Sequence, residues 1–185
     1  MKALIISDIH DHIQNLESAL NLAKTSGCHA VICCGDLCAP FVIDVFHRNT
    51  NLPVHIVFGN NDGDRITIQA KTIHANESRQ TGNKIHIHGE FLITNKTQNY
   101  EGIPHDISLA VYHYPIMASL LADSDNFDYV FYGHSHSSSL ETKNRTILAN
   151  PGSIMGYIPG PDPKKVHPTC LIVNWASREI ELIEL

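Results

Sequence analysis

The first half of this chain alternates short, mostly apolar runs with amphipathic stretches, and this alternation constrains the fold more than any other feature. The apolar runs at residues 3–6, 31–34 and 54–58 are typical of strands that are buried on both faces. Amphipathic stretches at 13–24 and 41–47 lie between them and predict helices. Strand–helix–strand repetition of this kind predicts parallel α/β layers in which helices cover the sheet.

The second half is richer in strand patterns than in helical ones. Residues 84–88 alternate polar and apolar side chains with the period of two that a strand requires. A segment rich in Pro and Gly at 156–168 is interpreted as a long loop. One helical pattern lies at 116–122. Further strand patterns lie at 91–93, 107–111, 128–132, 145–149, 169–173 and 180–183. We therefore expect an α/β fold, a sandwich of two sheets with helices outside, formed by residues 1–185 as one domain.

Length and composition exclude several classes of function. A chain of 185 residues with 43% hydrophobic residues can bury a core without disulfides or a structural metal. The net charge of −6 argues against a dedicated nucleic-acid binder, which would normally carry a basic face. Asp8 comes too early for a signal peptide, and no apolar run approaches the roughly 18 residues that span a bilayer. We expect a soluble, cytoplasmic protein that binds neither nucleic acid nor membrane.

The cysteines indicate reduced thiols. There are five of them, an odd number, and they are Cys28, Cys33, Cys34, Cys38 and Cys170. A secreted disulfide framework would space and pair them differently, so a cytosolic protein is the better interpretation. Cys34 and Cys38 could belong to a zinc site, but no second pair follows at finger-like spacing. Buried small hydrophobic residues are therefore expected.

Polar residues with metal-binding side chains recur where the expected strands end. They form five clusters, at 8–10, 35–36, 59–62, 113 and 133–136. Because ligands in open α/β sheets gather outside the carboxyl ends of the strands, these clusters are expected to converge. One such cluster alone is usually a cap or a turn, but five in this order predict a metal site. The thirteen histidines agree, since histidine is the commonest metal ligand in proteins.

The donor atoms of these clusters indicate which metals suit them. Carboxylate, imidazole and amide-oxygen donors come from Asp8, His10, Asp36, Asn60, His113, His134 and His136. This mixed nitrogen and oxygen set suits manganese, iron, zinc or nickel better than calcium or a thiolate-selected metal. Glycines at 35, 59 and 133 allow tight turns and a close approach of the backbone.

The ordered motifs of the calcineurin-like metallophosphoesterases resemble those of this chain: Asp8-x-His10, Gly35-Asp36, Gly59-Asn60, His113 and Gly133-His134-Ser135-His136. The short spacing and the turn at Asn150-Pro151-Gly152-Ser153 are similar to the small single-domain bacterial and archaeal phosphodiesterase branch. The resemblance covers essentially the whole chain. It implies a four-layer αββα sandwich, in which two mixed sheets are flanked by helices.

The resemblance also implies two divalent cations, with Mn²⁺ expected and Ni²⁺, Zn²⁺ or Fe as alternatives. The ligands that it implies for the first cation are Asp8, His10, Asp36 and His136. For the second they are Asp36, which bridges, and then Asn60, His113 and His134. Two cations about 3.5–4 Å apart can share a hydroxide. They can also clamp the attacking and the leaving oxygen of an in-line displacement. The expected reaction is hydrolysis of a small phosphodiester or phosphomonoester by attack of that bridging hydroxide.

Asn61 departs from the family pattern, because the wider family usually has a histidine there that helps the leaving group. Asparagine cannot give up a proton, so general-acid help, typically about 10²–10⁴-fold, is expected to be absent. We expect Asn61 to act in catalysis by donating a hydrogen bond to a phosphoryl oxygen. Diesters with good leaving groups are therefore favoured over monoesters. His12 is either a substitute acid or a surface histidine, and Tyr114 either narrows the site or packs.

The remaining polar residues are expected to have structural or solvated positions. Asp62 is expected to order its loop through turn hydrogen bonds. His86 and His88 share one face of a strand and are interpreted as solvated. Residues 164–167, with two lysines and a histidine, are interpreted as a solvated loop, with contact to a phosphate as the alternative. The segment 90–105 is either a substrate-facing insertion or a hairpin for contacts in a homo-oligomer.

A non-catalytic scaffold on the same fold is the alternative function, as in the retromer subunit that resembles this family. Such scaffolds tend to lose residues at metal-ligand positions, whereas every such position here carries a competent side chain. This favours the enzyme. A nuclease would need a basic surface or an additional nucleic-acid domain, and the sequence displays neither.

Overall fold

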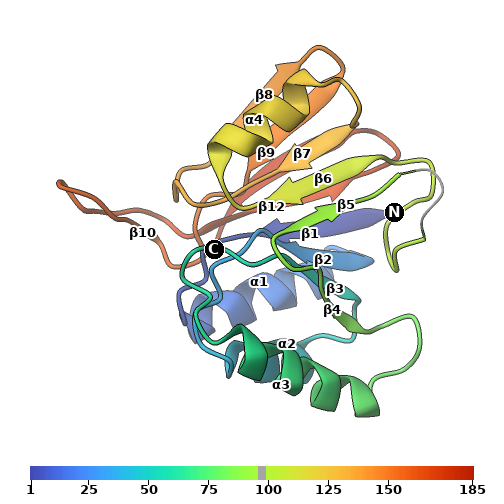
Figure 1. The fold of residues 1–185 in the computed structure, drawn as a ribbon, viewed down its shortest axis with the longest axis vertical. Helices are drawn as coiled ribbons and strands as arrows, with labels where there is room; N and C mark the ends of the chain where they lie inside the picture. Colours follow the sequence, from blue (N-terminus) through green and yellow to red (C-terminus); the bar gives the residue numbers. More distant parts are fainter. Residues whose placement is uncertain (96–98) are drawn as a thin grey trace.

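The computed structural model describes residues 1–95 and 99–185, and it consists of two mixed sheets stacked face to face with helices on their outer faces (Figure 1). The first sheet has the strand order β13-β12-β1-β2-β3-β4. Its strands are β1 (Lys2–Ile6), β2 (Ala30–Cys33), β3 (Val54–Ile56), β4 (Ile85–Ile87), β12 (Thr169–Asn174) and β13 (Glu179–Glu184). Strands β1 to β4 are parallel, and β12 joins β1 antiparallel.

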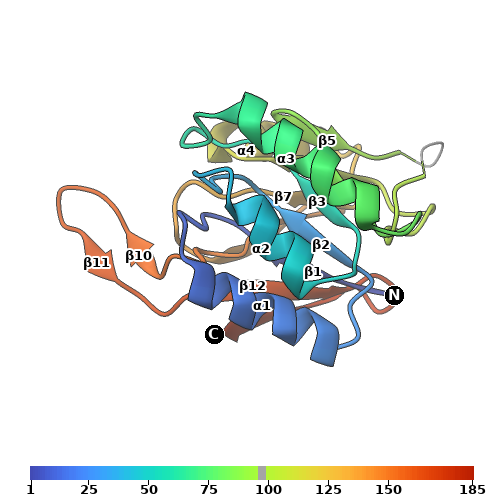
Figure 2. The same ribbon diagram turned by 90° about the horizontal axis from the view of Figure 1, so that it is seen from below.

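The second sheet has the strand order β5-β6-β7-β9-β8, with β6, β7 and β9 parallel and the two edge strands antiparallel. Its strands are β5 (Phe91–Ile93), β6 (Leu109–Tyr112), β7 (Tyr129–Phe131), β8 (Ser139–Lys143) and β9 (Thr146–Asn150). A separate antiparallel hairpin, β10 (Tyr157–Ile158) and β11 (Lys164–Lys165), extends away from the body of the molecule (Figures 1 and 2).

Helices cover both outer faces of this sandwich. They are α1 (Ile13–Thr25), α2 (Val42–Asn49), α3 (Arg65–Ser78) and α4 (Pro115–Asp123). Helices α1, α2 and α3 lie side by side over the first sheet, and α4 covers the second (Figures 1 and 2). The layers therefore follow the order helix, sheet, sheet, helix, and the expected αββα sandwich is confirmed.

The core follows from the alternation of side chains along each strand. On β1, Leu4 and Ile6 pack toward the helices, while Ala3 and Ile5 pack toward the second sheet. All four are fully buried. Burying a side chain such as leucine or isoleucine stabilises the fold by about 1.5–3 kcal/mol. A strand that is apolar at every position therefore has to lie between two layers, as the sequence predicted.

Two parts of the chain differ from the expectation. The segment 156–168 was expected to be a loop, and this was wrong because it contains the hairpin β10–β11. Each of its strands has only two paired residues between glycines and prolines, too few for a periodic pattern. Helix α3 was not expected, because its β-branched residues obscure a helical pattern. It begins after Asp64, whose carboxylate accepts a hydrogen bond from the backbone N–H of Thr67 at 3.1 Å.

Two further expectations bear on the outer surface of the molecule. Among the described helices, none is long and apolar enough to cross a membrane. The expected insertion at 90–105 begins with β5, the edge strand of the second sheet, and its residues 96–98 lie outside the described residues.

Candidate metal centre

The five polar clusters meet at one edge of the sandwich, beyond the carboxyl ends of β1, β2, β3, β6 and β7. Backbone hydrogen bonds join the loops to one another. Asp8 N–H donates to Gly35 O at 3.0 Å, and Gly133 N–H donates to His113 O at 3.0 Å. The second bond links neighbouring strands of the second sheet, and the first links neighbouring strands of the first. The backbone N–H of His134 donates to Asp8 Oδ2 at 3.0 Å and so joins a loop of the second sheet to a loop of the first. Loops from both sheets therefore contribute to one site.

The backbone at this edge is strained. Positive φ angles occur at residues other than glycine, with 53° at Asp8, 43° at His10, 57° at Asp36, 69° at His134 and 57° at His136. Side chains with a Cβ adopt this left-handed region at a cost on the order of 1–3 kcal/mol each. Such strain persists only where surrounding structure enforces it, and it clusters at functional sites. All five residues were expected metal ligands from the sequence alone.

Two glycines allow the loops to come this close. A Cβ at Gly133 would lie 2.7 Å from Asp8 Oδ2, and a Cβ at Gly59 would lie 2.8 Å from Asp36 Cγ. Side chains at these positions would therefore displace the two buried carboxylates. The sequence predicted that the backbone at these glycines comes close to a neighbouring group. In the structure these neighbours include the side chains of Asp8 and Asp36.

Asp8, His10 and His136 form a first group with the geometry of candidate metal ligands. The Nε2 atom of His136 lies 3.3 Å from Asp8 Oδ1 and 3.1 Å from His10 Nε2. The other ring nitrogen of His136, Nδ1, donates to the backbone oxygen of Tyr157 at 2.5 Å. A carbonyl can only accept, so the proton of a neutral His136 lies on Nδ1. The lone pair on Nε2 then points at the carboxylate.

Asp8, Asp36 and His113 form a second such group. His113 repeats the arrangement of His136, because its Nδ1 donates to the backbone oxygen of Cys34 at 2.8 Å. Its Nε2 lies 3.4 Å from Asp36 Oδ2 and 3.1 Å from Asn60 Oδ1. Asn60 Oδ1 is also 2.9 Å from Nδ1 of His134, whose side chain faces solvent. The structure thus brings together all seven residues that the sequence predicted as ligands.

In the neutral tautomers that the backbone carbonyls set, an Nε2 lone pair faces a carboxylate oxygen in both groups, and either a shared proton or a cation between them relieves this repulsion. The pKa values of Asp8 and His113 are shifted by these contacts. Burial raises the pKa of Asp8, but hydrogen bonds with His10 and His136 outweigh burial and hold it well below its usual range. Burial lowers the pKa of His113, but the hydrogen bond and charge of Asp36 outweigh burial and raise it. Buried carboxylates and correctly oriented imidazoles are a donor set that fits divalent transition metals.

Asn61 and Asp62 hold Asp36 and the surrounding loops. The backbone N–H of Asn61 donates to Asp36 Oδ1 and its side-chain amide donates to Asp36 Oδ2, both at 2.8 Å. The amide of Asn61 therefore orients the carboxylate, and its contact with a phosphoryl oxygen stays a prediction. Asp62 accepts backbone N–H groups from Gly59, Asp36 and Cys38. This confirms the expected role of Asp62 in ordering its loop.

Three contacts escaped the sequence analysis, because they join residues that are distant in the chain. Cys38 Sγ lies 3.4 Å from His10 Nδ1, the ring nitrogen that faces away from Asp8. Ser153 Oγ donates to Asp8 O at 3.1 Å, and Asn150 Nδ2 donates to Gly133 O at 3.0 Å. The turn at 150–153 was noted in the sequence as a motif, but the sequence alone did not say which loops it holds.

The zinc site considered for Cys34 and Cys38 finds no support among the candidate metal-ligand groups of the described residues. All five cysteines lie in that part of the chain and are free thiols, four of them buried. Neither of the candidate metal-ligand groups found there contains a cysteine. Burial raises the pKa of Cys38 to about 12, so its sulfur is protonated at neutral pH.

His12 and Tyr114 have separate roles beside the centre. His12 caps helix α1, because its Nδ1 accepts a hydrogen bond from the backbone N–H of Asn15 at 3.4 Å. The Tyr114 ring packs against His113 and His134, with ring centroids 5.2 and 5.1 Å away, and it is 36% exposed. Tyr114 therefore borders the opening of the centre.

His86 and His88 differ from the expectation of solvated histidines. Together with His55 on β3 and with Tyr100 they form a stacked cluster, in which the His86 and His55 centroids are 5.1 Å apart. His55 Nε2 donates to Glu101 O at 2.8 Å, so its Nδ1 accepts from His88 Nε2 at 3.0 Å. Burial lowers the pKa of His55 to about 4 and that of His88 to about 3. The rings of His55 and His88 therefore pack as neutral imidazoles.

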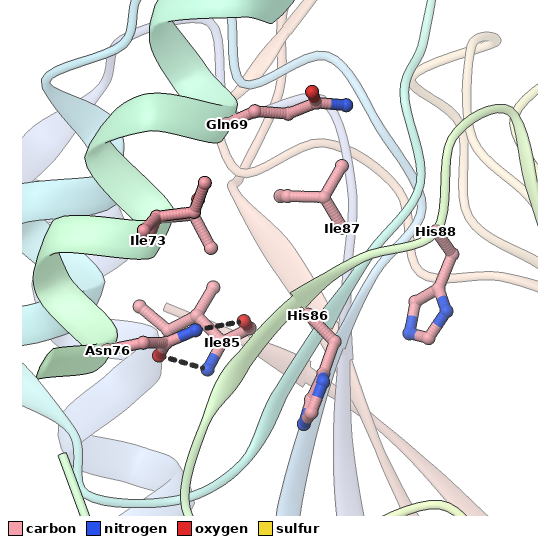
Figure 3. Close-up of a pocket in the computed structure, with 8 residues that line it drawn as sticks. Gln69, Ile73, Asn76, Ile85, His86, Ile87 and His88 are labelled. Atoms are coloured by element: carbon pink, nitrogen blue, oxygen red, sulfur yellow. Dashed lines mark hydrogen bonds between the residues drawn. The ribbon is translucent and has the colours of Figure 1, made fainter.

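The other face of β4 borders a groove that lies between β4 and α3. Figure 3 shows Ile85 and Ile87 directed toward α3, whereas His86 and His88 are directed to the opposite side. The side chain of Asn76 donates to Ile85 O at 2.8 Å and accepts from Ile85 N–H at 2.9 Å. It thus satisfies the backbone of an edge strand. No residue of this groove belongs to either candidate metal-ligand group.

Comparisons with known proteins agree with this architecture. A family model described as the calcineurin-like phosphoesterase superfamily domain matches residues 1–177. The phosphodiesterase MJ0936 of Methanocaldococcus jannaschii is 29% identical over 163 residues, which cover 86% of this chain and 88% of that protein.

Two solved structures are also similar. The structure of an archaeal phosphodiesterase superimposes with a TM-score of 0.82 at 28% identity and covers all of both chains. The YfcE phosphoesterase of E. coli superimposes with a TM-score of 0.61 at 18% identity, covering 100% of this chain and 99% of that one. At that identity the second likeness supports the fold alone.

Proposed function

This chain belongs to the calcineurin-like phosphoesterase superfamily, and we propose that it hydrolyses small phosphodiesters with the help of two divalent metal ions. The single observation that carries the proposal is the convergence of two buried carboxylates with imidazoles whose Nε2 lone pairs face them. A relative named as a phosphodiesterase, at 29% identity, supports the diester class.

We assign the first metal ion to Asp8, His10, Asp36 and His136, and the second to Asp36, Asn60, His113 and His134. The position of Asp36 supports its bridging role, because Oδ2 lies 3.5 Å from His10 Nε2 and 3.4 Å from His113 Nε2. Asn60 supports the second set, since its Oδ1 lies between the rings of His113 and His134. An amide oxygen adds no charge, so two divalent cations with two carboxylates would leave the centre net positive toward a phosphate.

When bound, the metal ions would supply Lewis-acid stabilisation of the negative charge that develops on the phosphoryl oxygens. The residues of the chain do the positioning. Backbone carbonyls fix the tautomers of His113 and His136, and Asn61 fixes the rotation of the Asp36 carboxylate. We propose Mn²⁺ as the metal, because a mixed nitrogen and oxygen set suits it, with Ni²⁺, Zn²⁺ and Fe as alternatives.

The identity of residue 61 supports diesters over monoesters. Asparagine offers no proton to a departing alcohol, and the ring of His12 is used as a helix cap. Substrates whose leaving groups depart without a proton are therefore favoured. We propose that Asn61 acts in catalysis by contacting a phosphoryl oxygen once substrate is bound. A steep dependence of rate on leaving-group pKa is expected, and a flat dependence would contradict this role.

The composition supports a small substrate. A net charge of −6 repels nucleic acid, so we propose that residues 1–185 act as one cytoplasmic domain on a small ester rather than on nucleic acid or a membrane. Whether copies of the chain form a homo-oligomer is measured by light scattering after gel filtration.

The test is hydrolysis of bis-p-nitrophenyl phosphate and p-nitrophenyl phosphate by protein stripped with a chelator, with and without added Mn²⁺. Turnover is expected only with metal, and faster with the diester. Asp36→Ala and His134→Ala are expected to abolish it. His74→Ala is the matched control, because His74 is an exposed histidine on α3 that belongs to neither group.

Counting bound metal by mass spectrometry separates the enzyme from the scaffold alternative. Two metal ions per chain are expected in the wild type, and fewer in Asp36→Ala. Two bound ions without turnover of any ester would reject the enzyme and favour a metal-binding scaffold. Full turnover in the stripped protein without metal would reject the metal assignment.

A further inference from the structure

A groove of about 500 Å³ lies beside the metal centre and shares a wall with it. His136, whose Nε2 faces Asp8, also lines this groove. The hairpin β10–β11 and the segment after it also line the groove, through Ile158, Lys165 and Val166. A cavity of this size holds a group as large as a nucleoside or an aromatic ring with substituents.

The hairpin is fixed to the metal centre at its base. The backbone oxygen of Tyr157, the first residue of β10, accepts the hydrogen bond that orients His136. Just before the hairpin, Met155 N–H donates to Asp8 O at 3.0 Å, and after β11 Val166 N–H donates to Gly156 O at 3.1 Å. The groove is therefore held in a set position relative to Asp8 and His136, although the tip of the hairpin extends away from the body (Figures 1 and 2).

The lining of the groove combines apolar surface with a cation. Ile158, Val166 and Leu182 offer apolar contacts, and Leu182 is 50% exposed. Lys165 contributes an ammonium group and His167 an imidazole, while Glu184 lies on the β13 side. The lysine ion pairs found in residues 1–95 and 99–185 join Lys71 to Asp44 and Lys143 to Asp123, so Lys165 is not neutralised by one.

We propose that this groove is the subsite for the second ester group of a phosphodiester, the group that does not leave. It takes an aryl- or nucleoside-sized group, whose ring contacts Leu182 and the hairpin, and whose anionic or acceptor atoms contact Lys165. A phosphomonoester has no group to place there. This inference rests on the proposed phosphoesterase function and narrows its substrate class to diesters with one bulky, retained substituent.

The test compares two diesters that share a leaving group, bis-p-nitrophenyl phosphate and methyl p-nitrophenyl phosphate. Wild-type kcat/KM is expected to favour the aryl diester by about 10-fold, mainly through a lower KM. Leu182→Ala and Lys165→Ala are each expected to reduce this preference about 3-fold or more. Both side chains are exposed, so neither substitution removes part of the core. Lys164→Ala is the matched control, since Lys164 is the neighbouring exposed lysine and does not line the groove.

The outcomes separate the two proposals. If the wild type hydrolyses both diesters and the preference is unchanged in Leu182→Ala and Lys165→Ala, the subsite is rejected and the phosphodiesterase stands. A parallel loss of activity toward both diesters and p-nitrophenyl phosphate would also reject it, because the groove would then serve the leaving group or the fold. If the metal-loaded wild type hydrolyses no ester, the function and the subsite are both rejected.

Discussion

At the scale of single residues, the centre depends on close approach and on the partners of its imidazoles. The sequence predicted the seven donor residues, because each follows a recognisable strand and the carboxyl ends of parallel strands must meet. It did not predict Cys38 or Ser153 as their neighbours. Those contacts arise only when loops from different strands fold against one another, and no local pattern encodes them.

Gly133 is expected to be intolerant of a side chain. In Gly133→Ala the added Cβ would lie 2.7 Å from Asp8 Oδ2 and still closer to Ser7 Oγ. We expect a loss of roughly 1–3 kcal/mol in the free energy of unfolding and at least about 100-fold in activity, since Asp8 has to move. Gly63→Ala is the control, because nothing lies within 4 Å of a Cβ there. Equal stability of the two variants in denaturant titrations would contradict the prediction.

Cys38 is expected to tune the first metal site through His10. A metal-binding histidine usually donates its second N–H to a partner, and for His10, which we propose as a ligand, that partner would be the thiol of Cys38. Cys38→Ala removes the partner and is expected to weaken metal affinity about 10-fold or more in calorimetric titrations. Cys38→Ser keeps a hydrogen-bonding group and is expected to stay close to the wild type. An unchanged affinity in Cys38→Ala would show that the thiol only fills space.

At the scale of elements, the sequence predicted strands and helices with strong periodicity and missed those without it. Strand β1 and helix α1 carry uninterrupted apolar runs or a clear apolar face, and both formed as expected. Helix α3 has few buried residues, and the hairpin β10–β11 has two pairs of residues, so neither leaves a periodic signal. The interpretation of His86 and His88 on β4 as solvated also failed, because their contact with His55 on β3 depends on the register between the two strands rather than on either strand alone.

The pairing of β3 with β4 is expected to weaken in acid. His55 and His88 have folded-state pKa values of about 4 and about 3, below the ordinary value of 6.5. Between pH 6.5 and these folded-state values, the unfolded chain therefore binds more protons than the folded chain does. Stability is fully present above pH 6.5 and is lost as the pH falls toward 4, by up to about 1.4 kcal/mol per pH unit for buried His55.

Denaturant titrations between pH 7.5 and pH 4.5, on chelator-treated protein, measure this slope. His55→Phe keeps a ring of similar shape and is expected to flatten the slope relative to the wild type. His74→Ala serves as the control, since His74 is exposed on α3 and outside the stacked cluster. If His55→Phe and the wild type lose stability in parallel as the pH falls, the neutral packing of His55 is not the cause.

At the scale of the whole molecule, the centre joins the two sheets. Asp8 and Asp36 follow strands of the first sheet, whereas His113, His134 and His136 follow strands of the second. Without a cation, shared protons join the buried carboxylates to the imidazoles across this edge. If cations bind as we propose, the same atoms would be shared ligands, so metal binding is expected to stabilise the packing of one sheet on the other.

Thermal unfolding tests this coupling directly. A ligand that binds only the folded state stabilises it by about 2.7 kcal/mol when its concentration is 100 times Kd, so Mn²⁺ is expected to raise Tm by several degrees. Asp36→Asn removes one of the two carboxylates and is expected to abolish most of this rise, while Asp44→Asn, an acidic residue on α2 paired with Lys71, keeps it. The same Tm with and without metal would mean that the ion does not bind at the junction, because preferential binding to the folded chain must stabilise it.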